Sequence, residues 1–292
     1  MTFLVIFSLA SKAQLFYEIT GNGLKEPSYL FGTHHLASDA IIKEYNLDLF
    51  VDEVNQIVGE IDLTQDQMAL AMAMQPYMMA PADSTISTLL SPEDFAAVDE
   101  VFKKYAPMPG MTLKMVDMMK PMVVTTMITV GVMSEQMSDF NPEVQLDSYL
   151  MKRGKEGGKK ITPLETADFQ ASVLYNTTPI AIQAEDLVEV AKNPEKLISS
   201  SQKLNEAYAN GDLETMMQLS EQEDSSPEFM QALLDRRNAD WLTKLPTILQ
   251  DGPTFIAVGA LHLAGDKGIV EGLRKLGYKV EGVVAAEIVP EP

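Results

Sequence analysis

The sequence feature that most constrains the fold is a pair of similar segments, one near each end of the chain. Each is a short apolar run that leads into Gly-x-x-His-Leu, at residues 29–36 and 255–263. A short apolar run next to glycine is typical of a buried strand, and α/β proteins place many functional side chains in the turn after a strand. The two segments hold all three histidines of the 292-residue chain, at positions 34, 35 and 262. We therefore expect the two turns to meet in space.

Other strand-like segments lie close to these two. Residues 15–20 alternate apolar and polar side chains, and the turn Gly21-Asn22-Gly23 joins them to the strand that ends at Phe31, which predicts a hairpin. A helix over residues 40–54 and a strand over residues 56–63 then predict a parallel β-α-β unit. Near the other end, residues 254–284 predict a second unit of the same kind.

Helical patterns fill the middle of the chain. Residues 65–153 read as helices, including a long apolar helix from Met115 to Met137 with an expected kink at Pro121. The sequence thus predicts an α/β fold with a central mixed, largely parallel sheet, flanking helices and a mainly helical insertion. We expect a single domain over residues 14–292, in which residues 15–64 and 155–285 form the sheet and residues 65–153 form the insertion.

The first residues are typical of a signal peptide. An apolar run over residues 3–10 precedes Ser11-Lys12-Ala13, which resembles a cleavage site before Gln14. This pattern predicts a signal peptide over residues 1–13 and an exported protein, periplasmic or secreted, although a basic n-region is missing; a buried first strand is the alternative. No stable transmembrane anchor is predicted, because no segment reaches about 20 apolar residues without a break.

Composition excludes several classes of function. The chain has no cysteine, which rules out thiolate metal sites, cysteine nucleophiles and disulfides. Its formal net charge of −20 argues against binding nucleic acid, whose phosphates require lysine and arginine. The same charge argues against an anionic membrane surface and is compatible with attracting a divalent cation.

Glu60 stands out among the 42 acidic residues. It lies in the apolar stretch 56–63, where an unpaired carboxylate is costly unless it is paired or binds a metal. In a parallel sheet it would emerge near the same end as His35. One histidine at a strand end is more often structural, but three in two similar turns favour a functional site, because neutral imidazole is the commonest metal ligand and the usual general base near neutral pH.

Five blocks of sequence resemble the TraB/GumN family, which includes the TIKI-type membrane proteases. They occur in the family's order, from about residue 15 to residue 284, and the C-terminal block is the most specific. The blocks are residues 28–36, 58–62, 162–170, 236–238 and 255–280. The resemblance implies an α/β fold similar to that of the erythromycin-esterase and ChaN-like proteins.

The resemblance also implies a metal-dependent hydrolase or protease site built on the two Gly-x-x-His motifs and an acid. Carried over by position, the metal ligands are His35, Glu60 and His262. Further positions match the other blocks or stand next to a ligand; these are Glu165, Arg237, Asn238 and the weaker candidate His34.

These residue types support a definite chemistry. Two imidazoles and one carboxylate can hold a divalent ion (Zn, Mn or Co) with an open position, and a bound water then has its pKa lowered toward about 7 for zinc. Glu60 can be only a ligand or a general base at one time, so Glu165 is the candidate for the other task. Arg237 is expected to stabilise an oxyanion, with Asn238 and His34 as accessory residues.

The sequence therefore predicts a peptidase of the TraB/GumN type that acts on a peptide or protein through a metal-activated water. The chain has neither the His-Glu-x-x-His helix of zincins nor a Gly-x-Ser-x-Gly elbow. Two alternatives stay open. One is a non-catalytic, ChaN-like protein that binds haem or a metal ion, and the other is a regulatory protein whose site is vestigial.

Overall fold

The computed structural model describes residues 15–136, 145–222 and 226–283 of the chain. The predicted signal peptide over residues 1–13 lies outside these ranges, as does Met137. Within the described ranges, no helix has both the length and the apolar character needed to cross a membrane.

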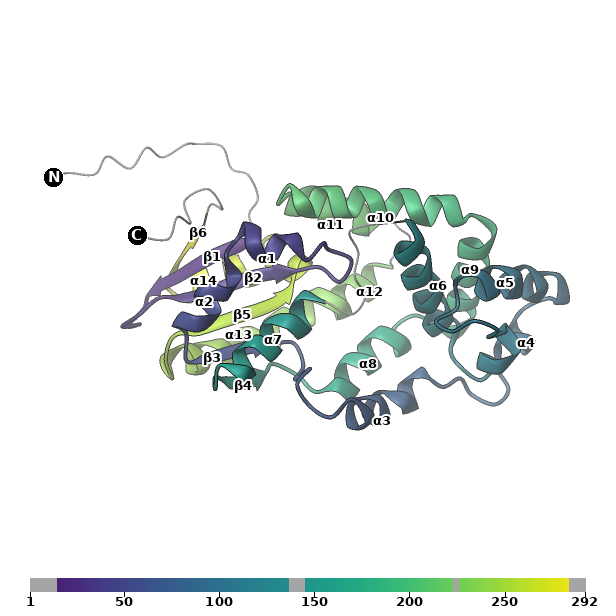
Figure 1. Ribbon diagram of the computed structural model, residues 1–292, viewed down its shortest axis with the longest axis horizontal. Helices are drawn as coiled ribbons and strands as arrows, with labels where there is room; N and C mark the ends of the chain where they lie inside the picture. The colour runs from purple at the N-terminus through teal and green to yellow at the C-terminus, as the bar shows by residue number, and fades with distance from the viewer. Residues whose placement is uncertain (1–14, 137–144, 223–225, 284–292) are drawn as a thin grey trace.

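A six-stranded sheet forms the core of one half of the molecule (Figure 1). Its strand order is β4-β3-β5-β2-β1-β6. The strands are β1 (Phe16–Gly21), β2 (Ser28–Thr33), β3 (Gln56–Gly59), β4 (Lys160–Pro163), β5 (Thr254–Gly259) and β6 (Tyr278–Gly282). Strand β1 runs antiparallel to both of its neighbours, and the other three pairs are parallel. The predicted α/β class with a mixed, largely parallel sheet is confirmed, as is the hairpin of β1 and β2.

The two histidine motifs follow the central strands of this sheet. Strands β2 and β5 are parallel neighbours, and their last residues, Thr33 and Gly259, are paired. The chain after β2 and the short helix η3 (Ala260–Leu263) after β5 therefore leave the same edge side by side. This placement agrees with the expectation that the two turns meet.

Helices cover both faces of the sheet. On one face, Phe16 packs against Phe50 of α2 (Leu47–Glu53) and against Phe255, while Gly154 lets α7 (Leu146–Glu156) approach Ile57. On the other face, α13 (Arg236–Gln250) is bound through Gln56, whose Nε2 donates to the carbonyl of residue 248 at 2.9 Å. Side chains alternate along β3, so the bond from residue 56 and the packing of residue 57 place α13 and α7 on opposite faces.

The prediction of a single helix over residues 40–54 is wrong, because two shorter helices occupy this stretch. They are α1 (Ala40–Glu44) and α2, and Asn46 between them adopts a left-handed conformation with φ of 46°. Asparagine tolerates this conformation better than most residues. The break lets the chain turn between the two short helices.

A second apolar core lies away from the sheet, at the right of Figure 1. It joins α5 (Pro92–Tyr105) and α6 (Pro121–Gln136) to α9 (Ile180–Lys192), with Phe102 and Ile128 fully buried. The helical half thus includes α9, beyond the predicted insertion. The remaining helices are α3 (Gln67–Met78), α4 (Ile86–Leu89), η1 (Leu113–Val116), α8 (Ala167–Asn176), α10 (Pro194–Ala209), α11 (Leu213–Gln222), α12 (Pro227–Met230), η2 (Gln231–Asp235) and α14 (Ile269–Lys275).

The predicted kink at Pro121 is also wrong. Pro121 is the first residue of α6, and the separate short helix η1 ends at Val116, before a non-helical segment over residues 117–120. Proline has no N–H to donate and its fixed φ suits the first turn of a helix, so it begins helices more often than it bends them.

We predict that residues 155–292 do not fold when expressed alone, as a single domain requires. Strand β4 pairs with β3, β5 pairs with β2 and β3, and β6 pairs with β1, so the described residues of this fragment contain no pair of bonded strands. Circular dichroism and the dispersion of the amide NMR spectrum would measure the outcome, with the full chain as the control. A stable, cooperatively unfolding fragment would contradict the single-domain prediction.

Candidate functional site

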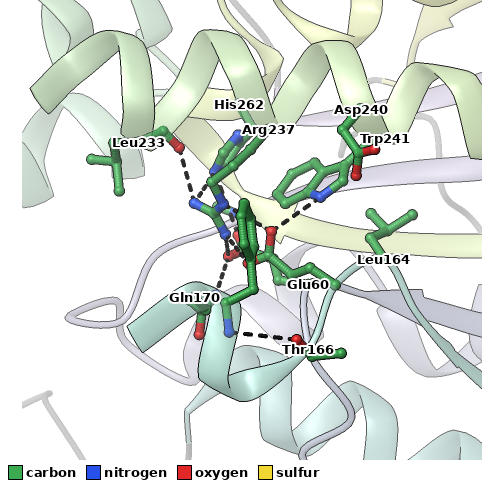
Figure 2. Close-up of polar contacts among 12 residues, drawn as sticks. Glu60, Leu164, Thr166, Gln170, Leu233, Arg237, Asp240, Trp241 and His262 are labelled. Atoms are coloured by element: carbon green, nitrogen blue, oxygen red, sulfur yellow. Dashed lines mark hydrogen bonds and ion pairs between the residues drawn. The ribbon is translucent and has the colours of Figure 1, made fainter. Parts of the chain in front are cut away.

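Arg237 lies at the centre of a buried polar network (Figure 2). It is 3% exposed and is the second residue of α13, which follows the π-helical turn η2 directly; such turns often occur at functional sites. Its Nε donates to Glu165 Oε2 at 3.0 Å, and its Nη2 donates to Glu165 Oε1 at 2.6 Å. This two-bond geometry is the strong form of an arginine–carboxylate pair and fixes the plane of the guanidinium.

Glu60 follows β3 and joins Arg237 to two other elements. Its Oε2 accepts from Arg237 Nη2 at 2.6 Å and from Gln170 Nε2 at 2.8 Å, while its Oε1 accepts from the Gly259 amide at 2.8 Å. Burial favours protonation, but the interactions with His262, Arg237 and the Gly259 amide outweigh burial and lower the pKa of Glu60 to about 2. Glu60 is therefore ionised at neutral pH.

His262 contacts Arg237 with one ring nitrogen and Asn238 with the other. Its Nε2 lies 3.0 Å from Arg237 Nη1, and its Nδ1 lies 2.7 Å from Asn238 Oδ1. A guanidinium can only donate, so Nε2 carries the lone pair, and the Asn238 oxygen accepts from Nδ1–H. The pKa of His262 is lowered to about 4, mainly by burial; Glu60 opposes this shift and Arg237 adds to it. The ring is neutral, with its free electron pair directed at the network.

Trp241 packs against three residues of the network. Its Nε1 donates to Glu165 Oε2 at 3.2 Å, and its ring centre lies 4.4 Å from that of His262. The guanidinium of Arg237 lies 4.8 Å from the tryptophan ring, within cation–π range. Burial raises the pKa of Glu165, against the opposing effect of Arg237.

The structure does not bring His35 to this network. Its side chain is 74% exposed, and its Nδ1 lies 3.5 Å from Asp147 Oδ2. Within the described part of the chain, no hydrogen bond or ion pair joins His35 to Glu60 or His262. In the same ranges, no three His, Cys, Asp or Glu side chains are grouped closely enough to hold a metal ion. Of the predicted site residues, the network unites Glu60, Glu165, Arg237, Asn238 and His262.

His34 faces the interior. Its ring centre lies 5.2 Å from that of Tyr208, and its Nε2 is buried without a hydrogen bond among the described residues. The pKa of His34 is lowered to about 4, mainly by burial and to a smaller extent by the neighbouring His35, while a hydrogen bond with Asn205 opposes the shift.

Three residues in or near the polar network are not among the site residues predicted from the sequence. Gln170 lies inside one of the blocks that resemble the family, and Trp241 lies one turn after Arg237, but neither position was given a role. Asp147 lies in the first turn of a helix, where acidic side chains are common and usually face solvent. Its sequence position therefore does not distinguish it, and only the structure shows that it is buried.

Two pairs of possible metal ligands are present, although neither pair has a third His, Cys, Asp or Glu side chain grouped with it among the described residues. His262 Nε2 and Glu60 Oε1 lie 3.8 Å apart, and two ligands with bonds of about 2.0–2.2 Å can share one ion up to about 4.2 Å apart. The bond from Nδ1 to Asn238 fixes the tautomer, as in many metal-binding histidines. In the second pair, Asp147 Oδ2 lies 3.5 Å from Nδ1 of the exposed His35; this oxygen is buried and has no hydrogen bond among the described residues.

The lowered pKa of His34 predicts a loss of stability in acid. Between about pH 6.5 and pH 4, the unfolded chain binds a proton at this residue and the folded chain does not, so the free energy of unfolding falls as pH falls. The contribution is at most about 3 kcal/mol. Urea unfolding of wild type and His34→Gln at pH 7 and pH 4.5 would measure it. The variant should lose less stability than wild type, with the exposed His35→Gln as control; equal losses in all three would contradict the assignment.

The comparison with known families identified one match. The sequence model of the TraB/PrgY/gumN family matches residues 15–282, which include every strand of the sheet and the whole polar network. No curated protein and no solved structure shows significant similarity to the chain.

Proposed function

The chain belongs to the TraB/PrgY/gumN family, and from this membership and its buried polar network we propose that it is a metal-dependent hydrolase of peptide or amide bonds. One observation supports this most strongly: an ionised carboxylate and a neutral imidazole lone pair lie 3.8 Å apart beside a buried guanidinium. This combination is expensive to bury. It brings a carboxylate, a neutral imidazole and a guanidinium together, and the proposal gives them the roles of anionic ligand, neutral ligand and anion-stabilising group.

In this proposal, Glu60, His262 and His35 hold the ion, which supplies a water of lowered pKa when bound. Glu60 suits a ligand because it stays ionised far below neutral pH. His262 offers the lone pair of Nε2, so a cation there would replace the hydrogen bond from Arg237 Nη1. His35 is exposed, and its side chain would have to turn toward the others.

Arg237 is the residue we propose for stabilising a developing oxyanion. Once Nη1 no longer donates to His262, it is free to donate to a substrate oxygen, while Nε and Nη2 keep their bonds to Glu165. Fixed donors of this kind typically contribute about 10²–10³ in rate. We propose that Glu165 acts through Arg237 as a positioning residue, because both of its oxygens are already engaged; its role as a general base stays a prediction.

A cavity of about 660 Å³ adjoins the network beyond Asn238 and Leu261. Apolar side chains line part of it, including Met217, Met230 and Leu234. A pocket of this volume and mixed character suits a side chain or short segment of a peptide substrate.

The test is hydrolysis of a broad peptide library by wild-type protein and by Glu60→Gln. We expect hydrolysis that a chelator removes and that Zn²⁺, Mn²⁺ or Co²⁺ restores. Glu60→Gln should lower the rate by at least about 100-fold, because it removes an anionic ligand and leaves an amide beside Arg237. Lys25→Gln, at an exposed position of the β1–β2 turn, serves as the control variant. A wild type that binds metal yet cleaves no peptide would contradict the proposed activity.

A further inference from the structure

The cavity beside the polar network changes in character between its inner end and its mouth. It has a volume of about 660 Å³ and lies between α11, α12, the turn η2 and the segment that follows β5. Leu234 and Asn238 are buried and form its inner end, whereas Glu221 and Asp266 are exposed and lie at its mouth. Much of the remaining lining is apolar and consists of Met217, Pro227, Met230, Leu261 and Ala264.

Asn238 connects the inner end of the cavity to the polar network. Its Oδ1 lies 2.7 Å from His262 Nδ1, and its Nδ2 donates to the carbonyl oxygens of His262 at 3.2 Å and Lys267 at 3.0 Å. These three bonds fix the amide between the imidazole and the cavity. A group bound at the inner end is therefore separated from His262 by one side chain.

The charge of the lining favours a cationic ligand. Among the described lining residues, Lys267 is the only cation, and its Nζ is paired with Asp235 Oδ2. The side chains of Glu221 and Asp266 have no hydrogen bond or ion pair with residues 15–136, 145–222 or 226–283. Three carboxylates and one ammonium group give the lining a net charge of −2. The formal charge of −20 on the whole chain adds a long-range attraction for basic peptides.

We propose that this cavity is a specificity pocket for an arginine or lysine side chain, at a position of the peptide substrate next to the bond that is cleaved. The methylene groups of such a side chain pack against Met217, Met230 and Leu261, because methionine adapts readily to an apolar stem. Its cationic end reaches Glu221 and Asp266 at the mouth and stays partly hydrated there. This inference rests on the proposed hydrolysis of peptide bonds and names the class of substrate.

The two carboxylates at the mouth distinguish a basic side chain from an apolar one. Norleucine offers a similar stem to the cavity but leaves Glu221 and Asp266 without a partner, and a glutamate side chain adds a third negative charge beside them. An exposed ion pair contributes only up to a few-fold in affinity, so two pairs predict a preference of about 10-fold for arginine over norleucine.

The experiment uses fluorogenic peptides that carry arginine, norleucine or glutamate on either side of the cleaved bond. The value of kcat/KM for wild type is measured with each peptide and with the metal ion that supports hydrolysis. Binding of the same peptides to chelator-treated protein is measured by fluorescence anisotropy. We expect arginine to exceed norleucine by about 10-fold in both measurements at one of the two positions. Salt at 0.5 M should reduce the preference, since exposed charges are screened.

Variants at the mouth test the assignment of the two acids. The double variant Glu221→Gln, Asp266→Asn should reduce the preference for arginine to less than about 2-fold, and Glu221→Lys should shift it toward the glutamate peptide. The matched control is the double variant Glu185→Gln, Glu195→Gln, which removes the same charge from exposed positions of α9 and α10 outside the cavity. This control should keep the preference of wild type.

The two measurements separate this inference from the proposed function. If wild type cleaves the arginine and norleucine peptides with equal kcat/KM, the cavity does not select basic side chains, although the proposed hydrolysis stands. If no peptide is cleaved, the proposed function fails, and anisotropy alone then decides the role of the cavity. Equal affinities for the two peptides, or a preference for arginine that survives in the double variant at the mouth, would overturn the inference.

Discussion

Replacing Arg237 with methionine is expected to destabilise the protein by about 3–5 kcal/mol, because it removes the guanidinium that binds the buried carboxylates of Glu60 and Glu165. Arg237 and Glu165 side chains are each 2% exposed, so water cannot replace the lost bonds. Methionine fills a similar volume, which leaves charge as the main change. The free energy of unfolding by urea at pH 7 would measure the effect.

Two further variants test the cause of that loss. Arg237→Lys should recover little, since an ammonium group cannot make two parallel bonds to Glu165 and also reach Glu60. Adding Glu165→Gln to Arg237→Met should recover part of the stability, because it removes a buried negative charge left without a partner. If Arg237→Met costs less than about 1 kcal/mol, the network is not a buried ion cluster in solution.

Replacing Trp241 with alanine is the second change with a large expected effect, also about 3–5 kcal/mol. Trp241 is fully buried, and it contacts His262 and Arg237 through its ring and Glu165 through Nε1. The truncation opens a cavity against the residues that we propose for catalysis. Urea unfolding measures the stability, and peptide hydrolysis measures whether the network keeps its geometry.

Trp241→Phe is the matched control for this change. It keeps an aromatic ring against His262 and removes the hydrogen bond to Glu165, so we expect a loss of about 1–3 kcal/mol. A truncation to alanine that costs no more than the change to phenylalanine would contradict the packing role of the ring.

Much of the fold could be predicted from the sequence because its signals are local. The turn Gly21-Asn22-Gly23 specifies the first hairpin, and apolar runs that end in glycine mark β2 and β5. Boundaries inside the helical regions were less certain. The left-handed conformation of Asn46, which separates α1 from α2, depends on how the chain packs.

Most residues of the candidate site could be predicted from the sequence, but the orientation of their side chains could not. Glu60 and His262 each follow a strand, which predicts that they lie at the same edge of the sheet. The resemblance to the family adds Glu165, Arg237 and Asn238. The sequence does not specify side-chain rotamers, so the exposed direction of His35 could not be foreseen. Asp147 could not be found either, because burial of a helical acid is a property of the packed structure.

The metal content of protein purified without a histidine tag tests the central claim most directly. Wild type, His262→Ala and His35→Ala would be equilibrated with Zn²⁺, Mn²⁺ or Co²⁺, freed of unbound ion and examined by elemental analysis. We expect one divalent ion per chain in wild type and none in His262→Ala, since that variant loses the lone pair beside Glu60; His35→Ala should also lose the ion. Full occupancy in both variants, or no bound ion in wild type, would contradict it.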